Sequence, residues 1–162
     1  MDERERHGRI IAVADRIHAL SPETTESNRI SLLHVRLDDS MGDRIWLVDF
    51  STDWPELHLN KRIEEVKAIA RTDVQFLSLV FPAVVREILR EIITEQQITD
   101  PYCDDEDWQA LWLRFMVNLP GVPKEIPEGD DAEPWIETAV GAFCAYHRTL
   151  ERYQARLAEH RQ

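Results

Sequence analysis

Hydrophobic residues cluster in two segments of the chain in a pattern typical of β-strands. Residues 29–37 and 44–51 are rich in Ile, Leu, Val, Trp and Phe, and they flank the polar, turn-like segment 38–43. We therefore expect a short antiparallel hairpin over residues 29–51. A two-stranded ribbon is only marginally stable in water. We therefore expect it to be completed by a third strand from the N-terminal segment, by helices that cover it, or by a partner chain.

Apolar residues at helical spacing account for most of the remaining chain. A helical pattern begins near Asn60, and Thr72 and Asp73 restart it. Pro82 divides the next stretch, because proline cannot donate a backbone hydrogen bond inside a helix. Residues 3–20 fit a helix, with a strand over 9–13 as the alternative. The further helices are predicted over residues 73–80, 82–97, 105–118 and 134–160.

The last predicted helix carries an apolar stripe with a seven-residue repeat. Its steps alternate between three and four residues over three heptads, as in a helix that packs along another helix. An ordinary long bundle helix gives the same spacing, and both interpretations stay open at this point. The stripe consists of Ile136, Ala139, Phe143, Tyr146, Leu150, Tyr153 and Leu157.

These patterns predict an α+β fold that is predominantly helical. The hairpin over residues 29–51 packs against four to five helices, and a long helix ends the chain. A length of 162 residues fits a single domain. In that domain an α+β part, 1–99, precedes a helical part, 100–162, which contains an acidic connector.

The charge of the chain is strongly acidic and unevenly distributed. The net charge is −12, and residues 100–137 hold two basic against eleven acidic residues. This argues against direct binding to nucleic acid, whose phosphates need a basic face. The acidic groups that precede two predicted helices either stabilise the helix starts or form a surface for a basic partner. They are Asp104, Asp105, Glu106, Asp107, Asp130 and Asp131.

Several classes of protein are disfavoured by what the sequence lacks. No apolar run approaches the roughly 20 residues of a membrane-spanning helix, and the first residues lack the apolar core of a secretory signal. Two cysteines are too few for a disulfide framework. We find no glycine-rich phosphate loop and no Ser-His-Asp pattern, so we expect a cytoplasmic protein without a cofactor.

One segment resembles the acid-x-lysine element of metal-dependent nucleases. Glu65 and Lys67 are spaced as in that element, and Asp49 or Asp53 lies upstream. In such enzymes the acids hold Mg²⁺ and the lysine stabilises developing negative charge. The segment is predicted to be helical, however, and side chains two residues apart on a helix diverge.

A second candidate metal site lies in the predicted C-terminal helix. Cys144 and His147 are three residues apart, which would direct both toward one ion. The alternative is that Cys144 is a small core residue, and no other ligand has a spacing that would complete the shell.

The features that remain point toward contacts with other proteins. Trp54 lies between Asp53 and Pro55 in a predicted loop and is a candidate interface anchor. Arg148, Arg152 and Arg156 form a basic ridge on the last helix.

We therefore expect a non-catalytic intracellular interaction module, an accessory subunit or adaptor, with self-association through the C-terminal helix as one form of contact. One alternative is an acidic inhibitor or regulator that occupies the basic nucleic-acid site of a partner. A further alternative is a small metal-dependent hydrolase that uses Asp49, Glu65 and Lys67.

Overall fold

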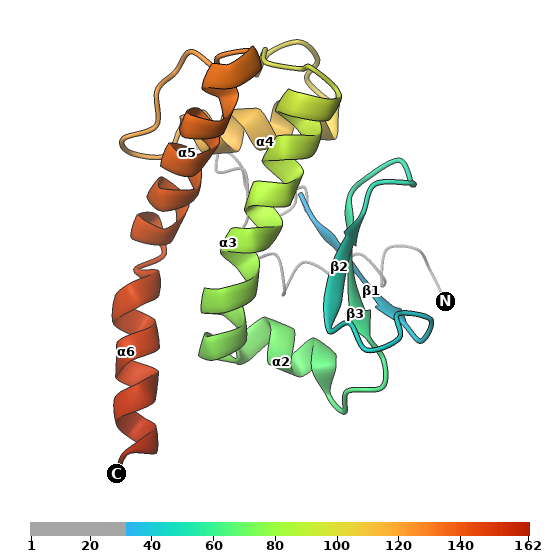
Figure 1. Ribbon diagram of the computed structural model, residues 1–162, viewed down its shortest axis with the longest axis vertical. Helices are drawn as coiled ribbons and strands as arrows, with labels where there is room; N and C mark the ends of the chain where they lie inside the picture. Colours follow the sequence, from blue (N-terminus) through green and yellow to red (C-terminus); the bar gives the residue numbers. More distant parts are fainter. Residues whose placement is uncertain (1–31) are drawn as a thin grey trace. The chain divides into compact units, whose positions relative to one another are not determined.

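A computed structural model describes residues 32–162, so the predicted helix over 3–20 and its alternative strand lie outside the described residues. The chain has an α+β fold with more helix than strand, as predicted (Figure 1). Its residues form two compact units, Met1–Asp73 and Val74–Gln162. None of the helices within residues 32–162 combines the length and the hydropathy needed to cross a membrane.

The first unit contains a mixed sheet of three strands. The strands are β1 (His34–Asp38), β2 (Trp46–Asp49) and β3 (Glu56–Asn60). Their order is β1-β3-β2, so that β3 is the central strand. It runs parallel to β1 and antiparallel to β2.

The predicted hairpin is therefore wrong in its pairing, although β2 lies within its predicted strand segment and β1 extends one residue, Asp38, beyond the other. The two strands do not pair with each other, because β3 lies between them and pairs with both. The segment Glu56–Asn60 alternates polar and apolar residues behind Pro55. Such alternation is typical of a strand with one polar face. It spans only five residues here, directly after the loop that contains Trp54, and for this reason β3 was not predicted.

The alternation gives the sheet one apolar and one polar face. Leu57 and Leu59 of β3 are fully buried, and the register places them opposite Val35 and Leu37 of β1. The other face carries Glu56, His58 and Asn60 from β3. Asp49 of β2 lies directly opposite Glu56 and joins this polar face.

Asn60 ends a strand and does not cap a helix, which corrects the predicted helix start. Its side-chain nitrogen donates hydrogen bonds to the carbonyl oxygens of Gly42 at 2.9 Å and Arg44 at 2.7 Å. Helix α2 (Val66–Thr72) begins after Glu65, whose left-handed backbone, with φ of 55°, separates it from the preceding turns.

The second unit is helical. It consists of α3 (Val74–Arg90), which continues into a π-helical turn η2 (Glu91–Glu95), then α4 (Trp108–Val117), a short 3₁₀ turn η3 (Gly129–Asp131), α5 (Ala132–Tyr146) and α6 (Thr149–His160). Helix α5 lies beside α3 (Figure 1), and Arg86 and Arg90 of α3 form ion pairs with Glu137 and Glu133 of α5.

Aromatic and aliphatic side chains from α3, α4 and α5 form the core of this unit. The ring of Phe115 on α4 contacts Trp112 at 6.2 Å and Phe143 on α5 at 6.5 Å, both edge to face. Ile88 on α3 and Ile136 on α5 are completely buried. The predicted helix over 105–118 is confirmed in type and location as α4.

Two predicted helix boundaries in this unit are wrong. Helix α3 runs without a break through Pro82, which was expected to divide it. Its neighbours Phe81, Val84 and Val85 are buried, so tertiary packing offsets the hydrogen bond that proline removes.

The predicted single C-terminal helix is two helices. Helix α5 ends at Tyr146, and Arg148 takes a left-handed backbone conformation with φ of 53° before α6 begins. The break divides the apolar stripe into a buried part around Phe143 and a part on α6 in which no residue is buried. Among the described residues there are five α-helices, within the predicted number.

Candidate functional site

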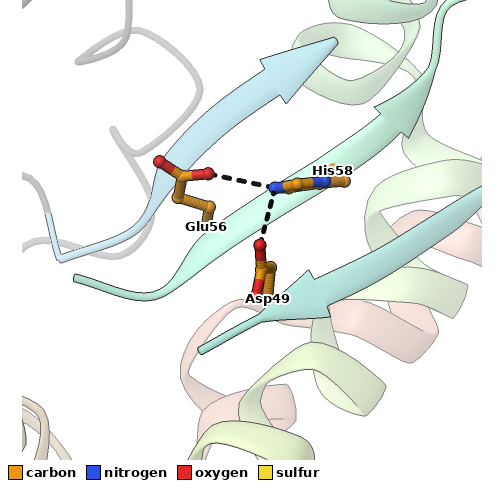
Figure 2. A group of neighbouring side chains, drawn as sticks. All are labelled: Asp49, Glu56 and His58. Carbon is orange, nitrogen blue, oxygen red and sulfur yellow. Dashed lines mark hydrogen bonds and ion pairs between the residues drawn. The ribbon is translucent and has the colours of Figure 1, made fainter. Parts of the chain in front are cut away.

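A histidine surrounded by carboxylates occupies the polar face of the sheet. His58 lies on the central strand β3, Glu56 lies two residues before it, and Asp49 projects from β2 (Figure 2). Asp38, the last residue of β1, contacts the other side of the imidazole. We call these four residues the His58 cluster.

The imidazole ring bridges the carboxylates through both of its nitrogens. Nδ1 lies 3.0 Å from Oδ2 of Asp38. Nε2 lies 3.0 Å from Oε2 of Glu56 and 3.5 Å from Oδ2 of Asp49. The ligand atoms of Asp49, Glu56 and His58 all lie within 4.8 Å of one another.

The cluster combines a buried imidazole with carboxylates that water can reach. The side chain of His58 is 9% exposed, whereas those of Asp49 and Glu56 are 28% and 19% exposed. Arg36 on β1 is the cationic side chain next to it, with Nη1 3.8 Å from Oε2 of Glu56, and it is largely exposed. Among residues 32–162 the three carboxylates thus outnumber the one guanidinium paired with them, and the excess charge is negative.

Two identical turns hold the aspartates of the cluster. Oδ1 of Asp38 accepts hydrogen bonds from the backbone N–H and the hydroxyl of Ser40, at 2.7 and 2.6 Å. Oδ1 of Asp49 accepts the backbone N–H of Ser51 at 2.8 Å. In each case the second oxygen, Oδ2, is left directed at His58.

These hydrogen bonds keep both aspartates ionised. The hydroxyl and backbone N–H of Ser40, followed by His58, lower the pKa of Asp38 to about 2. The backbone N–H of Ser51 is the main cause of the lowered pKa of Asp49. The cluster therefore presents carboxylate oxygens as acceptors at neutral pH.

Asp49 is the member of the His58 cluster that the sequence patterns predict as a site residue. Asp49 was predicted to act with Glu65 and Lys67, but these two residues are exposed at the start of α2 and do not belong to the cluster. The missed residues are Asp38, Glu56 and His58. Two signals point to them in the sequence: an Asp-x-Ser turn after each of two strands, and Glu-x-His on a third.

The acidic residues proposed for partner binding are exposed around the starts of α4 and α5. Within the described chain, neither Asp107 nor Asp131 caps its helix through the side chain. Asp105 forms an ion pair with Arg114 at 3.3 Å. Asp104, Glu106 and Asp130 are also exposed.

The residues proposed on the C-terminal helix lie in different environments. Tyr146 and Leu150 are 48% and 70% exposed, and Tyr153 is half-buried. Two arginines of the ridge pair with glutamates on their own helix: Arg148 with Glu151 at 2.7 Å and Arg156 with Glu159 at 2.9 Å. Arg152 and the buried Phe143 complete the proposed set.

Trp54 is half-buried, and its ring stacks on His34 at a centroid distance of 5.7 Å.

Cys144 is half-buried, and burial raises the pKa of its thiol against an opposing hydrogen bond from Thr149. Its predicted metal-binding companion, His147, packs its ring against Phe143 and Tyr146. Across residues 32–162, the group of side chains placed to share an ion is Asp49, Glu56 and His58 and includes neither Cys144 nor His147.

The chain matches no protein-family model, no curated protein and no solved structure. Its fold and site define it as a helix-rich α+β protein whose small mixed sheet carries a histidine–carboxylate cluster.

Proposed function

We propose that the protein is an intracellular protein–protein interaction module, an accessory subunit or adaptor, that contacts its partner through the apolar stripe of α5 and α6. The observation that carries this proposal is the exposure of apolar side chains on α6. Its residues Leu150, Tyr153 and Leu157 repeat at helical spacing, but Leu150 is 70% exposed and Tyr153 and Leu157 are only half-buried. A helix with an apolar face normally gains its stability by covering that face.

Exposed apolar residues lie on both sides of the break between α5 and α6. Tyr146 precedes the break and Leu150 follows it, and both are large apolar side chains with about half or more of their surface in water. Exposed apolar residues that adjoin along one surface mark interaction sites, and aromatic residues contribute strongly to binding energy there.

The charge of the second unit favours a basic partner over a second copy of the chain. Residues 100–137 carry a net charge of −9, and the whole chain carries −12. Since Arg148 and Arg156 are already paired with glutamates of α6, they leave this excess uncompensated. Like charge opposes self-association, whereas a positively charged protein is attracted.

A photo-crosslinking amino acid placed on α6 in cells tests the proposal. A crosslinker replacing Leu150 should yield one predominant adduct with a basic protein. One replacing Ala155, an exposed residue on the opposite face of α6, should yield none. The variant Leu150→Asp should retain the helical circular dichroism and lose the partner, because this side chain is 70% exposed.

Size-exclusion chromatography with light scattering supplies the complementary measurement. A monomer is expected for the purified chain. Adducts of the chain with itself, or equal adducts from positions 150 and 155, would contradict the proposed contact with a basic partner.

A second candidate function follows from the acidic residues before α4 and α5. They are exposed, and among the described residues Asp107 and Asp131 make no side-chain cap, so both side chains remain available to a partner. An acidic surface of this kind would suit a regulator that occupies the basic nucleic-acid site of its partner. Binding that survives the charge reversals Asp104→Lys, Asp105→Lys, Asp130→Lys and Asp131→Lys at low salt would exclude this function.

A further inference from the structure

We infer that Asp49, Glu56 and His58 bind one divalent transition-metal ion on the polar face of the sheet, with Asp38 positioning the imidazole. This inference concerns the first compact unit and is independent of the interaction proposed for α5 and α6. It rests on the direction of the imidazole nitrogens, on the spacing of the ligand atoms and on the charge around them.

The imidazole is oriented as it is in metal sites. Because the carboxylate of Asp38 only accepts hydrogen bonds, Nδ1 of His58 must be the donor across the 3.0 Å contact. In neutral imidazole this leaves a lone pair on Nε2, which points at Glu56 and Asp49 (Figure 2). A carboxylate that holds the far nitrogen of a ligand histidine is the recurrent outer shell of protein metal sites.

Three electron-pair donors that face one another repel unless a cation lies among them. A proton on Nε2 would donate a hydrogen bond to Glu56 across 3.0 Å, but a single N–H points in one direction and would leave Asp49 at 3.5 Å. A metal ion would accept an electron pair from all three groups. The three carboxylates around His58, set against one exposed guanidinium in the part of the chain that the structure describes, favour the doubly charged ion.

The spacing of the donors fits a shared ion. Metal–ligand bonds of about 2.1 Å place neighbouring donors about 3.0 Å apart in an octahedral shell and about 3.4 Å apart in a tetrahedral one. The distances from Nε2 to Glu56 and Asp49, 3.0 and 3.5 Å, lie close to the octahedral and the tetrahedral value respectively. The two carboxylate oxygens lie within 4.8 Å of each other.

The donor set selects the class of ion. One imidazole nitrogen with two carboxylate oxygens suits Zn²⁺ or Mn²⁺, and the order of stability of divalent ions places Zn²⁺ above Mn²⁺. Mg²⁺ and Ca²⁺ prefer shells made entirely of oxygen. The partial exposure of Asp49 and Glu56 leaves a path for the ion and room for water ligands.

Competition between the metal-stripped protein and a chromophoric chelator for Zn²⁺ tests the inference. We expect one Zn²⁺ per wild-type chain. The isosteric variants Asp49→Asn and Glu56→Gln should each weaken binding more than the loss of about 10–100-fold expected for the positioning variant Asp38→Asn. The matched control is Asp39→Asn, which removes an exposed neighbouring carboxylate and should bind Zn²⁺ as the wild type does.

Two further measurements keep the test decisive if a variant unfolds. In the wild type, Zn²⁺ should shift the NMR signal of the His58 Nε2 nitrogen. Co²⁺ should give visible absorption without a thiolate charge-transfer band, because neither Cys103 nor Cys144 is among the ligands. The inference is wrong if the wild type binds no Zn²⁺, if Asp49→Asn and Glu56→Gln bind as the wild type does, or if a thiolate band shows a cysteine site.

Discussion

Single residues of the first unit have roles that depend on the polar face of the sheet. Asp38 and Asp49 each use one oxygen to close a turn with a serine two residues later, and the other to contact His58. Asn60, at the end of the same strand as His58, ties β3 to the loop between β1 and β2. The turn and the site are therefore built by the same side chains.

Substitution of Asn60 by alanine should destabilise the fold. Alanine removes two hydrogen bonds to backbone carbonyls that lie in a largely buried setting, and the expected cost is about 1–3 kcal/mol of the free energy of unfolding. Urea denaturation followed by circular dichroism measures it. The exposed Asn118 is the control, and Asn118→Ala should change the free energy by less than about 0.5 kcal/mol. Equal effects of the two substitutions would show that the hydrogen bonds of Asn60 do not contribute to the free energy of unfolding.

The two cysteines should differ in their reactivity toward a thiol reagent. Burial raises the pKa of Cys144, so less thiolate, the reactive form, is present at neutral pH. Cys103 is exposed. In the native protein we expect labelling of Cys103 to be faster, and the labelling of Cys144 to accelerate as the pH rises. The single variants Cys103→Ser and Cys144→Ser identify each phase, and faster labelling of Cys144 would contradict the effect of burial.

At the scale of elements, the ends of two helices depart from the local sequence signals. Helix α3 continues through Pro82 because buried residues on both sides of it hold the helix in place. The C-terminal helix breaks at Arg148, although its apolar stripe continues without interruption in the sequence. Pro82, a helix-breaking residue, is tolerated inside α3, whereas Arg148, which has no helix-breaking character, separates α5 from α6.

Replacement of Pro82 by alanine should stabilise the protein. Alanine restores the missing backbone donor and removes the ring that crowds the preceding turn. A proline in a helix interior costs about 3 kcal/mol relative to alanine. The loss of packing by a half-buried ring offsets part of this, so we expect a gain of about 1–2 kcal/mol in denaturant unfolding. Leu79→Ala, in the same helix at an exposed position, is the control with little change. A fall in stability for Pro82→Ala would mean that the packing of the proline ring outweighs the missing backbone hydrogen bond.

At the scale of the whole molecule, the proposed ion site and the proposed partner surface lie in separate compact units. Asp49, Glu56 and His58 belong to the first unit, and the stripe of α5 and α6 belongs to the second. The two proposals can therefore fail independently. Loss of the ion should leave the crosslink from position 150 intact, provided that the fold is retained.

Zinc should raise the thermal midpoint of the wild-type protein. An ion that binds only the folded state stabilises it by about 2.7 kcal/mol at a free concentration of 100 times the dissociation constant. Differential scanning fluorimetry measures the shift, and addition of a chelator should reverse it. The shift should be much reduced in Asp49→Asn and unchanged in Asp39→Asn, and an equal shift in both variants would place the ion elsewhere.

The sequence by itself determined the class of the fold, the strand segments β1 and β2 and the helix α4, because each depends on a local period of apolar residues. It also determined the acidic charge of residues 100–137, which is a matter of composition. Only the tertiary structure decided that β3 lies between β1 and β2. This strand order also determines which carboxylates face His58. Strand order depends on pairing between segments that are distant in the sequence, and no local pattern contains that information. For the same reason the exposure of Leu150 on α6 could be recognised only once the structure showed the backbone break at Arg148.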